Sequence, residues 1–279
     1  MNRNMGTIKV ASPSFQESSQ NAVGRASMMG IPSTQFSRPT FLMCSPEWYE
    51  VRYVINPWMA GNIRRSNRDT AFEQWKGLYT TLKDIGDVRL LQSRPNSPDM
   101  TFIAHGALIN YGLAALSSFT NPERKPEEVH LRRWLEDAGF LPWQARHGIS
   151  FEGEGDAMFS PEGDRLWVAH GPRTSPLSHQ HLARGWQVEV SSLRLVDPRF
   201  FHLDTCFAPL HGGYVLYFPG AFDTSSLQKI ESAYPRPSDR HFRGGGRPVR
   251  MQRNQCRSRR HSPCRSIKQR PKSIATCWL

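Results

Sequence analysis

Residues 149–169, ISFEGEGDAMFSPEGDRLWVA, decide the class of fold. Short apolar runs in this stretch are separated by turns rich in glycine and acidic residues, a pattern typical of strands. Three runs lie within it, at 149–151, 157–159 and 166–169. Downstream, similar runs predict strands at 187–193, 200–203 and 213–218. The second half of the folded region is therefore predicted to consist mainly of short strands.

Upstream of that stretch, helices alternate with strands. Apolar side chains at helical spacing predict one helix over 70–85, ended by Gly86, and another over 127–138, ended by Gly139. The apolar stripes are Phe72, Trp75, Leu78, Tyr79 and Leu82 in the first helix, and Val129, Leu131, Trp134 and Leu135 in the second. Strands are predicted at 41–44, 88–91 and 101–109. This alternation predicts an α/β domain with several small sheets, and no repeat of fixed period is visible in the sequence.

The net charge of +12 is concentrated at one end of the 279-residue chain. Residues 236–279 contain thirteen Lys or Arg and one acid, Asp239, so this segment carries +12 and residues 1–235 carry none. Residues 1–38 have little apolar periodicity and cannot bury enough surface to offset chain entropy. We therefore expect a disordered lead at 1–38, a folded domain at 39–235 and a basic disordered tail at 236–279.

The five cysteines form neither an even framework nor a CxxC pair. We expect reduced thiols, no metal site and no cofactor, with Cys44 and Cys206 as small apolar core residues. No apolar stretch approaches the roughly 20 residues that span a bilayer, and the N-terminus lacks a secretion signal. A cytoplasmic protein that does not contact membranes is the default expectation.

Four local strings carry the functional signal: INPWM at 55–59, PDMTF at 98–102, FEGEGD at 151–156 and HLDT at 202–205. In chain order and spacing they resemble the pentein superfamily, which includes arginine deiminases, dimethylarginine dimethylaminohydrolases, amidinotransferases and arginine dihydrolases. The resemblance covers about 41–234. It implies a β/α-propeller of pseudo-fivefold symmetry, here with its closing C-terminal module missing or disordered.

The resemblance also implies roles for particular side chains in an attack on a planar guanidinium. His202 would be the general acid and base, with Glu152 orienting and charging its imidazole. Asp99 and Asp204 would hold the substrate guanidinium, Asp204 from the same face of a strand as His202. Arg124 and Arg173 match the carboxylate-binding arginines of the family, since an Arg fork suits a carboxylate.

Two positions bear on which guanidino substrate is bound. Asn56, in the string INPWM, favours the dihydrolase-like branch. His105, in the string FIAHGA at 102–107, departs from the family, because deiminases and dimethylargininases carry acids there and the dihydrolase-like branch usually has Asn. Arginine and N-methylated arginine, giving citrulline or ornithine, both stay open as substrates, and a homo-oligomer is a possible assembly.

The nucleophilic cysteine of the family lies near its C-terminus, in a module that is not recognisable in this sequence. Read one nucleotide forward, compatible codons for 250–256 give Ala-Cys-Asn-Ala-Thr-Ser-Val, and those for 243–249 give Glu-Glu-Ala-Asp-Ala-Arg-Phe. Met251, which has a single codon, fits this reading. We therefore expect a frameshift between Tyr234 and Arg243, which makes the tail a wrong-frame product and the chain weak or inactive. Cys277 lacks the preceding glycines that the family shows.

Two other functions stay open. An amidinotransferase would resolve the same intermediate with an amine instead of water. A non-catalytic protein could bind nucleic acid through its basic tail, where Arg257, Arg259, Arg260 and 268–272 could contact phosphates. The tail contains Phe242 and Trp278 but no interleaved aromatic platform, so nucleic acid is the less favoured partner.

Overall fold

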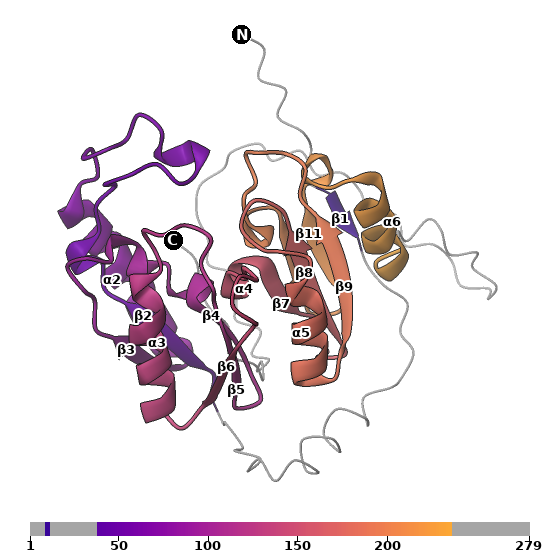
Figure 1. The fold of residues 1–279 in the computed structure, drawn as a ribbon, viewed down its shortest axis with the longest axis horizontal. Coiled ribbons are helices and arrows are strands. Elements are labelled where there is room, and N and C mark those ends of the chain that lie inside the picture. Colours follow the sequence, from indigo (N-terminus) through magenta and orange to yellow (C-terminus); the bar gives the residue numbers. More distant parts are fainter. Residues whose placement is uncertain (1–8, 12–37, 236–279) are drawn as a thin grey trace, which may run out of the picture.

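A computed structural model describes residues 9–11 and 38–235 of the chain (Figure 1). The strands are β1 (Lys9–Ala11), β2 (Thr40–Cys44), β3 (Asp87–Leu91), β4 (Ala107–Asn110), β5 (Leu113–Leu116), β6 (Leu141–Gln144), β7 (Ala157–Phe159), β8 (Arg165–His170), β9 (Glu189–Arg194), β10 (Phe207–Leu210) and β11 (Tyr214–Tyr217). The helices are α2 (Arg68–Ile85), α3 (Pro126–Asp137), α4 (Gly153–Asp156), α5 (Ser178–Trp186) and α6 (Thr224–Ala233). No helix within these ranges is long and apolar enough to cross a bilayer.

The strands and helices form repeated β-β-α-β units. In one unit β4 and β5 are antiparallel, α3 follows, and β6 returns parallel to β5; β7, β8, α5 and β9 repeat this order. β10, β11 and α6 begin a third copy. The first strands begin at Ala107, Ala157 and Phe207, so the units start 50 residues apart (157 − 107 = 50 and 207 − 157 = 50). Diverged side chains hide this period in the sequence.

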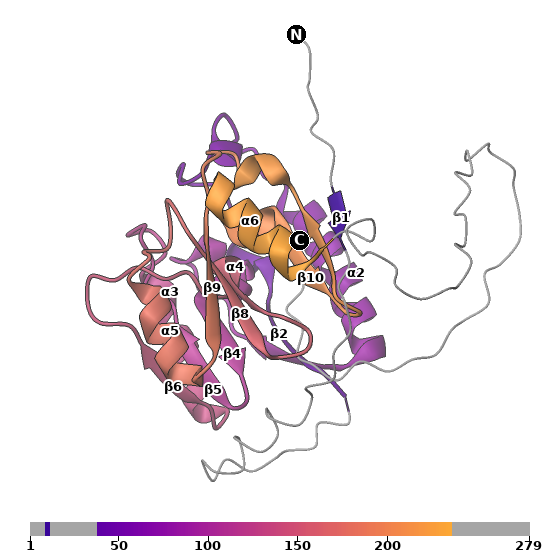
Figure 2. The same ribbon diagram turned by 90° about the vertical axis from the view of Figure 1, so that its right-hand side faces the viewer.

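Small separate sheets surround the short helix α4, and the longer helices lie on their outer sides (Figures 1 and 2). β2 and β3, joined by α2, form a parallel pair. The largest core cluster includes Trp167, Leu193, Phe207 and Val215, all nearly inaccessible to solvent. This burial of aromatic and aliphatic surface stabilises the region of β8 to β11.

The two predicted helices are confirmed, but their apolar stripes are only partly buried. In α2, Trp75 and Leu82 are buried, and the Asn67 side chain caps the first turn by accepting from the Thr70 amide at 2.9 Å. Phe72 is 42% exposed, and Val129 of α3 is 61% exposed. Spacing alone therefore identified the helices better than it identified which stripe residues face the core. Cys44 and Cys206 are both buried, which confirms their prediction as core residues.

Two of the predicted strands are wrong, and a third is only partly right. Of the strand predicted at 101–109, residues 107–109 lie in β4, and the earlier part lies in the 3-10 helices Pro98–Thr101 and Ile103–Gly106. Residues 149–151 make only an isolated bridge between Phe151 and Ser118. Residues 200–203 form no strand, because the chain turns into the 3-10 helix Leu203–Thr205. A helical turn of three or four residues is too short to show a period, so an apolar run of this length reads equally well as a strand.

The expected disordered lead is wrong at β1. This segment pairs antiparallel with the outer edge of β11, Lys9 opposite Tyr217 and Ala11 opposite Val215. In the two preceding units a parallel strand, β6 or β9, occupies the equivalent edge. An open strand edge presents unpaired backbone groups, so a segment can pair there without the apolar periodicity that marks a buried strand. Residues 1–8, 12–37 and the expected basic tail at 236–279 lie outside the described residues.

Candidate functional site

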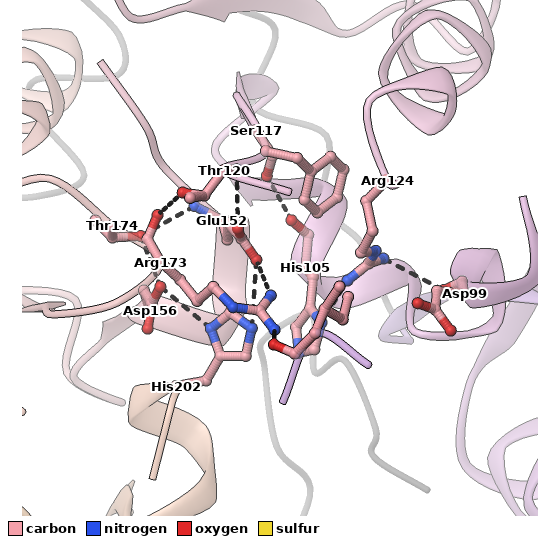
Figure 3. A network of polar contacts seen from close by, with 12 residues as sticks. Asp99, His105, Ser117, Thr120, Arg124, Glu152, Asp156, Arg173, Thr174 and His202 are labelled. Atoms are coloured by element: carbon pink, nitrogen blue, oxygen red, sulfur yellow. Dashed lines mark hydrogen bonds and ion pairs between the residues drawn. The ribbon is translucent and has the colours of Figure 1, made fainter. Parts of the chain in front are cut away.

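Three short helical turns carry the candidate residues, and each turn leads directly into the first strand of a unit. His105 lies in the turn before β4, Glu152 and Asp156 at the ends of the turn before β7, and His202 and Asp204 in the turn before β10. Figure 3 shows most of these side chains pointing toward a common centre. The contacts of each side chain show which of the predicted residues, among them His202, Glu152 and Asp99, meet in one site.

His202 lies between two carboxylates. Its Nε2 is 3.4 Å from Glu152 Oε2, and its Nδ1 is 3.2 Å from Asp156 Oδ2 (Figure 3). The imidazole is fully buried, and its centroid is 4.3 Å from that of His105. The backbone around Asp204 is a 3-10 turn, so the predicted strand geometry for His202 and Asp204 is wrong although both residues reach the site.

Arg173 is held inside the site by Glu152. Its Nη1 donates to Glu152 Oε2 at 2.9 Å, and its Nη2 donates to the Ile55 carbonyl at 2.7 Å. The guanidinium also lies over the ring of Phe201, 5.1 Å from its centroid. The other oxygen of Glu152 accepts from the Thr120 amide at 3.1 Å. Both oxygens of the Glu152 carboxylate therefore have strong donors from the protein itself.

Arg124 is equally enclosed, and it fixes the tautomer of His105. Its Nε and Nη2 donate to the two oxygens of Glu127 at 2.9 and 2.7 Å, and Nη2 also donates to the Asp99 carbonyl at 3.2 Å. Its Nη1 is 2.8 Å from His105 Nδ1. Since a guanidinium only donates, Nδ1 is the acceptor and the proton of neutral His105 sits on Nε2. That Nε2 faces Asp204 Oδ2 at 3.5 Å.

The charges of these groups respond to burial. Burial, together with the charges of His202 and Arg124, holds the pKa of His105 well below its ordinary value, which agrees with its neutral tautomer. Burial lowers the pKa of Arg124, but the charge of Glu127 outweighs this and raises the pKa overall. The directions of these pKa shifts favour a charged Arg124 beside a neutral His105.

Asp99 and Asp204 are predicted site residues whose carboxyl groups have unused acceptors; among the described residues, Glu123 Oε2 is also unused. Asp99 Oδ2 accepts from the Tyr53 hydroxyl at 2.9 Å, whereas Asp99 Oδ1 and both oxygens of Asp204 accept no hydrogen bond from the described residues. Burial raises the pKa of Asp99, opposed by Arg124 and Tyr53. Burial, with the charge of Asp156, raises the pKa of Asp204 well above its ordinary value. Both carboxyls would gain from a cationic donor placed between them.

Asn56 belongs to a loop at the border of the site. Its side-chain oxygen accepts from the Trp58 and Met59 amides at 3.0 and 3.1 Å, and so caps the turn Pro57–Met59. Two hydrogen bonds fix the loop to the rest of the domain. The Ile55 carbonyl accepts from Arg173, and Trp58 Nε1 donates to the Arg199 carbonyl at 3.1 Å. These two hydrogen bonds of the Asn56 side chain both lie within its own turn.

Comparison with known proteins identifies the family. N(G),N(G)-dimethylarginine dimethylaminohydrolase of Mycobacterium tuberculosis is 33% identical over 212 residues, which cover 75% of this chain and 68% of that protein. The crystal structure of the N-terminal domain of a cyanobacterial arginine dihydrolase, bound to its substrate, has a TM-score of 0.69 at 46% identity, covering 71% of this chain and 72% of that one. The chain belongs to the pentein superfamily. No family model matches the sequence.

This pentein is also similar to part of a larger enzyme. A bifunctional arginine dihydrolase/ornithine cyclodeaminase of Nostoc sp. is 48% identical over 195 residues, which cover 70% of this chain. The matched region spans only 28% of that relative's length. The propeller fold expected from the sequence is therefore confirmed by the structural match, while the bifunctional relative has a long region with no counterpart in the match.

Several residues that contact the predicted site residues were not predicted from the sequence. Asp156 lies beside His202 and accepts from Thr174, Glu127 pairs with Arg124, and Tyr53 donates to Asp99. Asp156 carried a signal, since it ends the string FEGEGD four residues after Glu152. The others gave none, because each contact joins segments whose proximity depends on the fold.

The glycines of FEGEGD are required by close packing in the pentein core. Gly153 has φ +59°, and a Cβ built on it would lie 2.6 Å from the Ala104 carbonyl. A Cβ on Gly155 would lie 2.6 Å from His105 Cδ2 and 3.2 Å from His202 Nδ1. The left-handed backbone of Gly153 and the missing Cβ atoms let this turn pass close to both imidazoles.

Proposed function

We propose that this chain binds the guanidino group of arginine or an N-methylated arginine, and that its site is built to hydrolyse that group by the Cys-His-Glu chemistry of penteins. The observation that carries the proposal is an excess of buried acid around His202. Two buried arginines, Arg124 and Arg173, face five acidic side chains, which leaves a formal charge of 2 − 5 = −3; the acids are Asp99, Glu127, Glu152, Asp156 and Asp204. A cationic ligand would offset the cost of burying them.

The free acceptors in the site fit a planar cation. Among the described residues, the buried carboxylate atoms that accept no hydrogen bond are Asp99 Oδ1, Glu123 Oε2 and the two Asp204 oxygens, and Asp99 and Asp204 are the two of these residues with predicted roles in substrate binding. A guanidinium offers several N–H donors in one plane and suits such a set. In the proposal Asp99 and Asp204 hold the guanidinium and His202 transfers protons. The relative crystallised with substrate is an arginine dihydrolase, which supports this class of ligand.

The roles proposed for the two arginines differ. On binding a substrate carboxylate, Arg173 would replace only its hydrogen bond to the Ile55 carbonyl, so we retain it as a carboxylate-binding residue. Arg124 donates to Glu127, His105 and the Asp99 carbonyl, and these bonds favour a supporting role in which it shapes the site. Asn56 and His105 are proposed to border the substrate.

Neither cysteine in the described part of the chain is suited to attack. Burial, with the charges of Glu127 and Glu47, raises the pKa of the Cys44 thiol to about 12. Burial, with the charge of Asp204, also raises the pKa of the Cys206 thiol. A thiolate is the nucleophile in this chemistry, so a raised pKa removes reactivity. Cys256, Cys264 and Cys277 lie outside the described residues.

We therefore propose that the reading frame changes between Tyr234 and Arg243, just after α6, and that hydrolysis by this chain is impaired. Resequencing the locus tests this directly: an uninterrupted frame without a nearby alternative would refute it. A second test compares this chain with one in which the alternative frame is restored. Restoration is expected to produce ammonia from arginine or dimethylamine from dimethylarginine, and robust turnover by the unrestored chain would contradict the proposal.

Ligand binding is tested separately from turnover, by equilibrium dialysis of labelled arginine and dimethylarginine against the chain. Asp204→Asn is expected to weaken binding at least about tenfold, because hydrogen bonds to a charged group contribute about 1.5–3 kcal/mol. The matched control is Asp137→Asn, which removes an exposed acid at the end of α3 and should leave affinity unchanged. Equal affinities in both variants would refute the site. Guanidinoacetate formed with added glycine would instead indicate an amidinotransferase.

A further inference from the structure

Asp156 lies within ion-pair distance of His202 and belongs to a buried hydrogen-bond network that the proposed function does not use; the His202 ring nitrogens themselves make no hydrogen bond among the described residues. Asp156 Oδ2 lies 3.2 Å from His202 Nδ1 and accepts from the Thr174 hydroxyl at 2.6 Å (Figure 3). Asp156 Oδ1 accepts from the Leu203 amide at 3.2 Å. The Thr174 hydroxyl accepts in turn from the Glu152 amide at 3.1 Å. Asp156 and Thr174 are each 1% exposed, so solvent does not compete for these contacts.

We propose that Asp156 is a positioning residue for His202: its carboxylate keeps a proton on Nδ1 and so makes Nε2 the nitrogen that exchanges protons with the reacting groups. The role of His202 in catalysis rests on the proposed function, but its tautomer does not. A carboxylate oxygen accepts and cannot donate, so the ring nitrogen facing it is stabilised when it carries a proton. A carboxylate behind a catalytic imidazole commonly fixes its tautomer in this way.

Glu152 is less suited to this role. Its Oε2 accepts from the cationic Arg173 at 2.9 Å, which weakens its pull on a ring proton, whereas Asp156 Oδ2 accepts from the neutral Thr174 hydroxyl; Oε2 also lies 3.4 Å from Nε2. Glu152 therefore faces Nε2, the nitrogen that gains and loses protons in the proposed mechanism. Asp156 lies behind the ring, where its two oxygens are fixed by Leu203 and Thr174. The two carboxylates therefore have different roles, because each faces a different nitrogen of the His202 ring.

The packing around His202 also restrains its orientation. The His105 ring lies against it at a centroid distance of 4.3 Å, with 34° between the planes. Gly155 brings the backbone of α4 so close that an added Cβ would be 3.2 Å from His202 Nδ1. The ring has little room to exchange its two nitrogens by flipping. Asp156 therefore faces Nδ1 as long as this packing holds.

The variant Asp156→Asn tests the proposal, because its amide has a forced orientation. The Leu203 amide needs an acceptor, so the Asn oxygen remains on that side and the NH₂ group faces His202 Nδ1 and the Thr174 hydroxyl, which can accept. A donor opposite Nδ1 makes that nitrogen an acceptor. The expected result is loss of the proton from Nδ1 and its transfer to Nε2.

The measurement is the ¹⁵N spectrum of the full chain labelled at histidine, with the His202 signals assigned by their loss in His202→Gln. In the parent, Nδ1 is expected to give the signal of a protonated ring nitrogen, and in Asp156→Asn that of an unprotonated one. Thr174→Val is the matched control, since it loosens the same network but keeps the carboxylate, and Nδ1 should stay protonated. Asp164→Asn, which changes an exposed acid, should leave the spectrum unchanged.

An unprotonated Nδ1 in the parent would overturn the proposal, as would loss of the Nδ1 proton in Thr174→Val and Asp156→Asn alike, which would show general loosening of the site. If Asp156→Asn does not fold, the parent and Thr174→Val spectra still decide. None of these measurements needs turnover or substrate. A failure of Asp156 to position His202 is therefore distinguishable from a failure of the chain to bind a guanidino compound.

Discussion

The buried pair of Arg124 and Glu127 allows the sharpest test of what holds the site together. Both side chains are almost inaccessible, and two parallel hydrogen bonds of 2.9 and 2.7 Å join them. Removing one partner of such a pair costs about 3–5 kcal/mol, because the other charge stays buried and uncompensated. In Glu127→Gln the retained amide oxygen keeps one hydrogen bond, which contributes about 1 kcal/mol. The expected loss of unfolding free energy is therefore about 2–4 kcal/mol.

Urea denaturation at neutral pH measures this loss as a lower midpoint with an unchanged slope. The loss is large, since a domain of this kind is stable by about 5–15 kcal/mol in total. Glu136→Gln is the matched control: the same substitution on the same helix, α3, but at an exposed position, should change stability by less than about 0.5 kcal/mol. If Glu127→Gln were as mild as this control, the pair would not support the site and the reasoning would be refuted.

Three further outcomes follow from the structure. Gly153→Ala should destabilise the domain by roughly 1–3 kcal/mol in thermal unfolding, because φ is +59° and the added Cβ meets backbone; Gly77→Ala, in open space on α2, should instead stabilise it by roughly 0.5–1 kcal/mol. Burial, partly opposed by the Ile109 amide, raises the pKa of Glu154 from 4.5 to about 8. Its contribution to stability is thus complete below pH 4.5 and is lost as pH rises through about 8, so the stability of Glu154→Gln relative to the parent should increase over that range in urea melts and level off above it; a constant difference would contradict this. Iodoacetamide at pH 8, with peptide mapping, should leave Cys44 and Cys206 unmodified in the folded chain and modify both in urea, and rapid labelling of either in the folded chain would show that its thiol is accessible.

The sequence predicted the longer elements of the fold and missed the shorter ones. α2 and α3 are long enough for their apolar side chains to reveal a helical period, and glycine follows each of them. Residues 101–106 contain similar apolar side chains, but they lie in two short 3-10 helices before β4. Their direction is set by the backbone of the neighbouring α4, which Gly153 allows to pass close to Ala104 and His105. That constraint comes from a segment about fifty residues away and leaves no local pattern.

The sequence predicted the members of the site better than their partners. The order of the four strings predicts that His202, Glu152, Asp99 and Asp204 lie together. In the structure, contacts join His202 to Glu152 and His105 to Asp204. The partner of His202 at Nδ1 was missed, because an acidic residue after two glycines is usually part of an exposed turn. Asp156 is instead 1% exposed.

The convergence of these residues follows from the repeat. Glu152 lies five residues before Ala157, the first residue of β7, and His202 lies five residues before Phe207, the first residue of β10 (157 − 152 = 5 and 207 − 202 = 5). The two therefore occupy equivalent positions in successive units, although one is an acid and the other a base. Equivalent positions around a pseudo-symmetry axis are equally far from that axis, so a position that reaches the centre in one unit reaches it in the next. The 3.4 Å contact between their side chains agrees with this symmetry, because chemically different residues at one repeated position then meet in a single site.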